Sequence, residues 1–119
     1  MQESPLFAKV HDLLAWLIPL TLKFPREHRF VIAQQVQNTA FELQSRLLDA
    51  RHGLNQTQSL RRSDSCLARL RAQLRLCLDW LLIAPRQYEH VSGRIVEIGR
   101  LLGAWIRSVA KSPVSAAAA

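Results

Sequence analysis

Four stretches of apolar residues, spaced alternately three and four positions apart, constrain the fold of this 119-residue chain more than any other feature. This spacing is the period of an α-helix with one buried face, and none of the stretches alternates as a β-strand does. Proline or glycine separates them, at Pro25, Gly53 and Pro85, and Pro113 follows the last stretch. The predicted core stripes are Leu6, Val10, Leu13, Leu17, Thr21 and Phe24; Ala33, Val36, Ala40, Leu43, Leu47 and Ala50; Leu67, Leu70, Leu74, Cys77, Leu81 and Ala84; and Tyr88, Val91, Ile95, Ile98, Leu102, Trp105 and Val109.

The pattern predicts four helices of about 20–27 residues, each about 30–40 Å long. Ser4 and Pro5 fit an N-cap and a first helical residue, and Gly53 fits a C-cap. We expect chain breaks near Phe24-Pro25, from Gly53 to Ser59, and at Ala84-Pro85. The fold class is therefore all-α, an up-down-up-down antiparallel four-helix bundle, with one domain over residues 1–111 and a flexible tail over 112–119.

The third and fourth helices carry more apolar surface than one bundle core requires. The fourth has a second stripe beside the first, and the third has one near its end. Gly99 and Gly103, one turn apart, allow another helix to approach closely, either within the chain or from a second copy. We therefore expect a homo-oligomer whose interface includes Gly99, Gly103, Ile106, Leu76, Trp80 and Ile83.

No segment has the length or composition of a membrane span or of a secretory leader. The longest uncharged apolar run, Leu13 to Leu22, has ten residues and contains Pro19, against the roughly 20 needed to cross a bilayer. The first ten residues lack a basic start, an apolar stretch and a small-residue cleavage site. A cytoplasmic protein is the expectation.

The sequence offers no catalytic or metal-binding constellation. The four histidines fall on different segments, and only Asp49 and His52 approach the spacing of a metal-binding pair. Both lie at a predicted helix end, where an imidazole beside the helix dipole is ordinary. Cys66 and Cys77 are eleven residues apart on one helix, too far for a disulfide, and are expected to be free and buried. We predict that the chain is not an enzyme and needs no cofactor or metal.

Basic residues are abundant and concentrated in the second half. The formal net charge is +7, and only three of the sixteen basic residues are lysines, so most offer the planar guanidinium that suits phosphate. Residues 55–119 carry ten bases and four acids. The third helix places Arg61, Arg71 and Arg75 on one flank and Arg62 and Arg69 on the other; the fourth aligns Arg86, Arg100, Arg107 and Lys111.

These rows predict a surface that binds the phosphates of RNA or DNA with little sequence dependence and strong salt dependence. Asp79 and Glu89 lie at helical spacing from Arg75 and Arg86 and are expected to neutralise the rows in part. The alternative is a solvated basic face that confers only solubility. Few aromatic residues fall outside the apolar stripes, so base stacking is not expected.

Three segments carry a resemblance to a known family: FPREHRF (24–30), LRAQLRL followed by LDWLLIAPRQYE (70–89), and EIGRLLGAWIRS (97–108). Together they resemble the accessory variability determinant (Avd) proteins of diversity-generating retroelements, over Leu13 to about Lys111. The wider four-helix-bundle family also contains proteins encoded within intervening sequences of bacterial ribosomal RNA genes.

The resemblance implies a pentameric barrel of four-helix bundles with a basic surface. Such accessory proteins bind nucleic acid and the retroelement's reverse transcriptase, which copies a template RNA into mutagenised cDNA, and they catalyse nothing themselves. Within the matching motifs, Arg71 and Arg75 would contact transcriptase or nucleic acid, and Arg100 would serve the subunit interface. Arg61, Arg62, Arg69, Arg107 and Lys111 are candidates by charge geometry alone. The alternative function is a structural helical oligomer or protein adaptor of the intervening-sequence branch.

Overall fold

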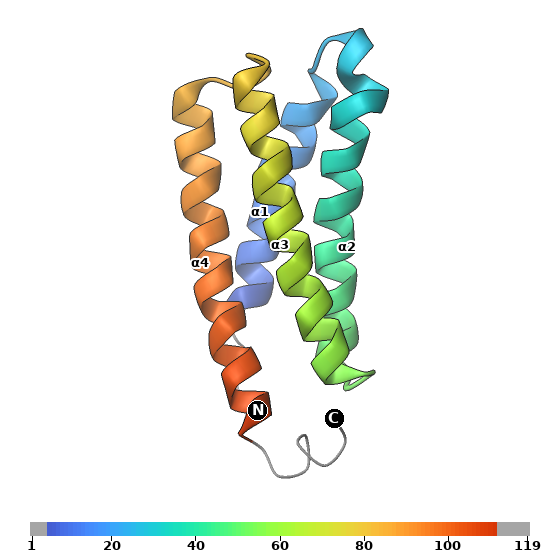
Figure 1. Ribbon diagram of the computed structural model, residues 1–119, viewed down its shortest axis with the longest axis vertical. Helices are drawn as coiled ribbons and strands as arrows, with labels where there is room; N and C mark the ends of the chain where they lie inside the picture. The colour runs from blue at the N-terminus through green and yellow to red at the C-terminus, as the bar shows by residue number, and fades with distance from the viewer. Residues whose placement is uncertain (1–4, 112–119) are drawn as a thin grey trace.

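Four long helices account for most of the chain in the computed structural model, which describes residues 5–111 (Figure 1). They are α1 (Leu6–Leu22), α2 (Gln34–Arg51), α3 (Gln56–Asp79) and α4 (Pro85–Ala110), with no strand anywhere in residues 5–111. The all-α prediction is therefore confirmed for this part of the chain. Both α1 and α3 pack against α2 and against α4, an arrangement compatible with the predicted bundle. Ser4 and the predicted tail lie outside the described residues.

The core forms along the stripes that the sequence pattern marked. Every predicted core position of the first two helical segments is buried. Five of the seven in α4 are also buried, and the remaining two, Tyr88 and Trp105, pack half-buried against the core. The helices form because each sequence keeps one apolar face turned inward along its whole length. None of the described helices is both long and apolar enough to cross a membrane.

The connection between α1 and α2 is more elaborate than a proline break. After Pro25 the chain makes a 3₁₀ turn, η1 (Arg26–His28), and then one wide turn of π-helix, η2 (Arg29–Ala33). The predicted break near Phe24-Pro25 is confirmed. Because of the π turn, α2 begins only at Gln34. Ala33 is buried as predicted, but it belongs to η2 and not to α2.

Two helix ends use the same hydrogen-bonding motif with different residues. At the end of α2, Leu54 N–H donates to Asp49 O and Gly53 N–H to Ala50 O, with Gly53 at φ 78°. This is the Schellman motif, whose left-handed position glycine fills most easily. The C-cap prediction for Gly53 is confirmed, but α3 starts at Gln56, so the break is shorter than the predicted Gly53 to Ser59.

The end of α3 departs furthest from expectation. Leu82 N–H donates to Cys77 O and Leu81 N–H to Leu78 O, and Leu81 takes the left-handed position at φ 61°. The helix therefore ends at Asp79, five residues before Ala84. The predictions that Leu81 and Ala84 belong to the core stripe are wrong, because both are exposed once the chain leaves the helix. Ile83, predicted on an exposed stripe beside Trp80, is buried beneath the turn instead.

Candidate nucleic-acid interface

The arginines of α3 divide between the two seams that this helix makes with its neighbours. Arg69 lies on the α2 side, where its Nη2 donates to Glu42 Oε2 at 3.1 Å. Arg71 lies on the α4 side, where its Nη2 is 3.1 Å from the position that a Cβ on Gly99 would take. The predicted division into two flanks is therefore realised, and the two flanks have different surroundings.

Arg69 is part of a small network that ties α3 to α2. Its guanidinium also donates to Cys66 Sγ at 3.2 Å, and Glu42 additionally pairs with Arg46 at 3.8 Å. Partial burial raises the pKa of Glu42, but the hydrogen bond and charge of Arg69, helped by Cys66 and Arg46, outweigh it and leave that pKa below its usual value. Arg69 is therefore held by a structural ion pair, which makes it the weakest of the predicted phosphate contacts.

Arg75 is partly neutralised, as the spacing predicted. Its Nε donates to Asp79 Oδ1 at 3.2 Å, one turn along α3. The hydrogen bond that Arg75 donates to Asp79, together with the charge of that carboxylate, raises the pKa of Arg75. The side chain remains two-thirds exposed, so the remaining guanidinium nitrogens can still reach a ligand. By contrast, no ion pair joins Arg86 to Glu89, although both are among the residues the structure describes.

The other candidates are exposed and carry no ion pair within residues 5–111: Arg61, Arg62, Arg71, Arg107 and Lys111. Arg100 differs, because its Nη2 donates to Glu97 Oε1 at 2.6 Å. That bond is the first cause of the raised pKa of Arg100 and the lowered pKa of Glu97. Arg71 and Arg107 are thus the uncompensated cations beside the glycine pair.

The glycine pair of α4 is open on its outer side. A Cβ on Gly103 would meet only Arg107 Nη1 at 3.4 Å, the far end of a side chain on the same helix. A Cβ on Gly99 would meet Arg71 Nη2 and, at an ordinary 3.8 Å, Leu67 Cδ1. No backbone of a neighbouring described helix crosses at either position. The sequence allowed a tight crossing within the chain as one reason for these glycines, and the described residues contain none.

These features combine into one surface, which we call the α3–α4 face: Arg71 and Arg75 from α3, with Gly99, Gly103 and Arg107 from α4. Because the glycines have no side chains, the guanidinium groups of Arg71 and Arg107 lie close to the α4 backbone. A surface of this kind offers charge-assisted hydrogen bonds to phosphate while allowing a close approach by a nucleic-acid backbone or another helix.

The predicted oligomer-interface residues have mixed positions. Leu76 and Trp80 are exposed, Ile106 is half-buried against the core, and Ile83 is buried as described above. Trp80 also contacts the His28 ring of η1, with ring centroids 5.9 Å apart. The sequence could not reveal this contact, because the two residues belong to different connections.

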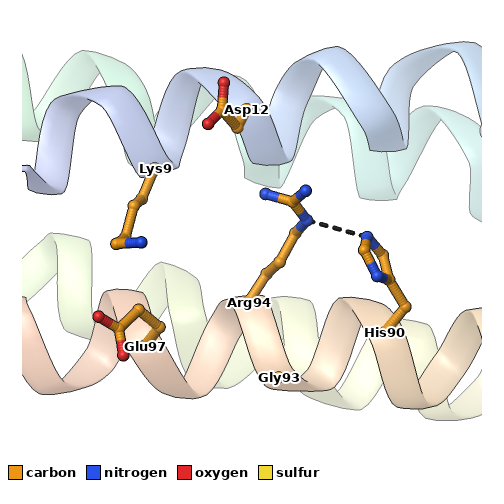
Figure 2. A pocket seen from close by; sticks show the side chains of 6 residues that line it. All are labelled: Lys9, Asp12, His90, Gly93, Arg94 and Glu97. Carbon is orange, nitrogen blue, oxygen red and sulfur yellow. Dashed lines mark hydrogen bonds between the residues drawn. The ribbon is translucent and has the colours of Figure 1, made fainter.

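A hollow between α1 and α4 gathers charged side chains that the sequence did not group (Figure 2). Lys9 extends from α1 toward α4, Asp12 of α1 also lines the hollow, and His90, Arg94 and Glu97 line it from α4. Arg94 Nε donates to His90 Nε2 at 2.9 Å, and the His90 ring lies 4.8 Å from that of Trp16. The charges of opposite sign interleave, so the hollow has no single preference for anions or cations.

No group of three or more metal-ligating side chains occurs in residues 5–111, and Asp49 and His52 gain no third ligand there. Cys66 and Cys77 are free and buried, as predicted. Burial raises the pKa of each thiol from 9.0 to about 11, which makes both poor nucleophiles near neutral pH.

The model of the family described as bAvd-like matches residues 6–109, almost the whole of the described chain. No curated protein matches the sequence.

Proposed function

From the membership of this chain in the bAvd-like family, we propose that it is the accessory protein of a diversity-generating retroelement. In this role it binds template RNA or cDNA and the reverse transcriptase, and so supports mutagenic cDNA synthesis and retrohoming. Proteins of the Avd kind are accessory and non-catalytic, and we propose the same for this chain.

The observation that carries the nucleic-acid role is the pair of uncompensated guanidinium groups on the α3–α4 face. Arg71 and Arg107 lie beside Gly99 and Gly103 of α4, and no carboxylate among the described residues neutralises either arginine. An unpaired guanidinium keeps all its donors for a ligand, whereas one held in an ion pair must first give up a partner. We therefore assign phosphate binding first to Arg71 and Arg107, next to Arg75, Arg61, Arg62 and Lys111, and last to Arg69.

The glycine pair supports the assembly part of the proposal. Glycine disfavours the helical state by about 1 kcal/mol relative to alanine, and at Gly103 no packing within the protomer requires it. Close approach by a helix of another protomer accounts for the pair, with Ile106 and Arg100 on the same helix as further interface residues. A homo-pentamer is the assembly that the family resemblance implies.

Binding of RNA and of DNA as a function of salt tests the nucleic-acid role. For each phosphate contact, log affinity falls by roughly 0.7–0.9 units per log unit of salt. Arg71→Ala and Arg75→Ala should each reduce that slope and weaken binding about equally across unrelated sequences, since phosphate contacts carry no base information. The double variant should also lose support of cDNA synthesis by the cognate transcriptase.

Arg94→Ala is the matched control. Arg94 is also an arginine on the paired helices α3 and α4, but it faces the α1 side and donates to His90. It should leave the salt slope unchanged. If the Arg71 and Arg75 double variant keeps the affinity and slope of the natural chain, phosphate binding by these two arginines is refuted. The nucleic-acid role must then move to Arg107 and the rest of α4, or give way to the structural-adaptor function.

A further inference from the structure

Leu81 is unfavourable in two respects, its backbone conformation and the exposure of its side chain. It occupies the left-handed position of the Schellman motif that ends α3, at φ 61°, where Gly53 stands in the equivalent motif of α2. A leucine there is strained because its Cβ crowds the backbone. Its side chain is also 88% exposed, so it gains nothing from burial within the protomer. An exposed apolar side chain held in a strained conformation points to a contact outside the described chain.

Leu81 is one of several exposed apolar side chains at the same end of the bundle. Leu76 lies in the last turn of α3, and Trp80 directly follows that helix. Leu22 ends α1, and Phe30 and Val31 lie in the connection from α1 to α2. Figure 1 shows both connections at the end of the bundle opposite the connection from α2 to α3. The 5.9 Å contact between the rings of His28 and Trp80 joins the two connections. We call this set of six apolar residues the end surface: Leu22, Phe30, Val31, Leu76, Trp80 and Leu81.

The π turn η2 contributes two exposed apolar residues, Phe30 and Val31, to the end surface. Ile32 and Ala33 of this turn are buried, whereas Phe30 is 82% exposed and Val31 is exposed beside it. Leu22 and Phe30 together line a hollow with Thr21, Arg29 and Gln37. Single π turns are rare and concentrate at functional positions. The hollow can receive an apolar side chain, and Phe30 can pack against it.

The charges around the end surface indicate what covers it. Residues 22–31 carry three bases, Lys23, Arg26 and Arg29, against Glu27 alone, and all four are exposed. Residues 76–86 add exposed Arg86, and their one acid, Asp79, is already paired with Arg75. An apolar centre with a basic rim complements apolar side chains bordered by carboxylates. A second copy of this chain has a net charge of +7, so its surface supplies fewer carboxylates for the basic rim than a partner of that kind does.

We propose that the end surface docks an amphipathic helix of a protein partner whose apolar face is flanked by aspartate or glutamate. Leu81, Phe30 and Trp80 fill the apolar centre, and the basic rim orients the helix. This binding site is separate from the α3–α4 face and does not depend on nucleic-acid binding.

A pair of synthetic peptides of about four helical turns tests the proposal with the full-length protein. The first carries leucines at positions i, i+3, i+4 and i+7 with flanking glutamates, and the second has lysine in place of every glutamate. Fluorescence anisotropy should detect binding of the acidic peptide and much weaker binding of the basic one. Leu81→Gly and Phe30→Ser should each weaken binding of the acidic peptide by about tenfold or more.

Leu81→Gly is the informative variant because it relieves the left-handed strain. It should keep or raise the urea midpoint of the protein while it loses peptide affinity, a combination that a structural role for Leu81 would not give. Leu54→Ser is the matched control, since Leu54 is also an exposed leucine in a connection but lies at the other end of the bundle. It should leave peptide binding unchanged.

Three outcomes overturn the proposal: native peptide affinity in Leu81→Gly, equal binding of the acidic and basic peptides, or a fall in the mass of the protein assembly on Leu81→Gly. The last result would make the end surface an interface between copies. RNA affinity and its salt slope should be unchanged in Leu81→Gly, so failure here is distinguishable from failure of the nucleic-acid role.

Discussion

Replacing Gly103 with alanine is expected to change the stability of the protomer and the stability of the assembly in opposite directions. Within the protomer the new methyl group would meet only Arg107 Nη1 at 3.4 Å, and that guanidinium can swing outward because it ends a flexible, exposed side chain. Alanine favours the helix by about 1 kcal/mol over glycine. We therefore expect Gly103→Ala to raise the free energy of unfolding of the protomer by about 1 kcal/mol.

The same methyl group should weaken the assembly. If a helix of another protomer crosses at Gly103, the added carbon overpacks that contact at a cost of about 1–3 kcal/mol. The dissociation constant would then rise about 5- to 150-fold. Urea unfolding at a concentration low enough to dissociate the assembly measures the first effect, and sedimentation equilibrium over a concentration series measures the second. Separating the two concentrations is necessary because association itself stabilises the folded state.

Gly93→Ala is the control, because Gly93 also lies in α4 and nothing beyond its own stretch of helix lies within 4 Å of its Cβ position. It should stabilise the protomer by a similar amount and leave the assembly unchanged. A less stable Gly103→Ala protomer would refute the reading of Gly103 as unconstrained within the chain. A more stable protomer with unchanged association would show that no helix of another copy crosses there.

Three further predictions concern stability. The free energy of unfolding should fall as the pH rises from 9 towards 11, because burial raises the pKa of Cys66 and Cys77 from 9.0 to about 11 while the unfolded thiols ionise earlier; urea midpoints should show a flatter pH profile for the double alanine variant. Glu42→Gln should cost about 0.2–1 kcal/mol at neutral pH by urea unfolding, since the pair with Arg69 is partly exposed. Because the pKa of Glu42 is lowered in the fold, the natural chain should lose this advantage as the pH falls below 4.5 and converge with the variant. Leu81→Gly should raise the free energy of unfolding by about 1 kcal/mol in thermal or urea melts, and a loss of stability would mean that the leucine packs usefully within the protomer.

The helices and their buried faces could be predicted because each depends on a local period. The alternating apolar spacing predicted two core stripes in the first two helical segments, and the structure buries every position of both. Gly53 marked the end of α2 because glycine has a strong preference for the left-handed position there. Such signals need no knowledge of neighbouring helices.

The candidate site was predictable only in part, because it depends on how helices are placed against each other. Helical periodicity placed Arg69 and Arg71 on opposite flanks of α3. It could not reveal that Glu42 of α2 would neutralise Arg69, or that Gly99 of α4 would lie beneath Arg71. Two arginines that look equivalent in the sequence therefore differ in the number of donors left for a ligand.

The end of α3 shows why a helical period can mislead near a chain reversal. The apolar spacing continues unbroken through Leu81 and Ala84, and it favours a helix up to Pro85. Proline disfavours helical backbone in the residue before it, and Ala84 is indeed extended, with φ −78° and ψ 155°. The chain also needs residues 80–84 to reverse direction between α3 and α4, so the helix ends at Asp79. Leu81, which continues the apolar spacing of α3, then lies in the chain reversal beyond the helix. It is exposed because the chain turns there toward α4. Apolar residues just before a proline at a chain reversal can therefore continue the spacing of a buried stripe and still be exposed in the fold.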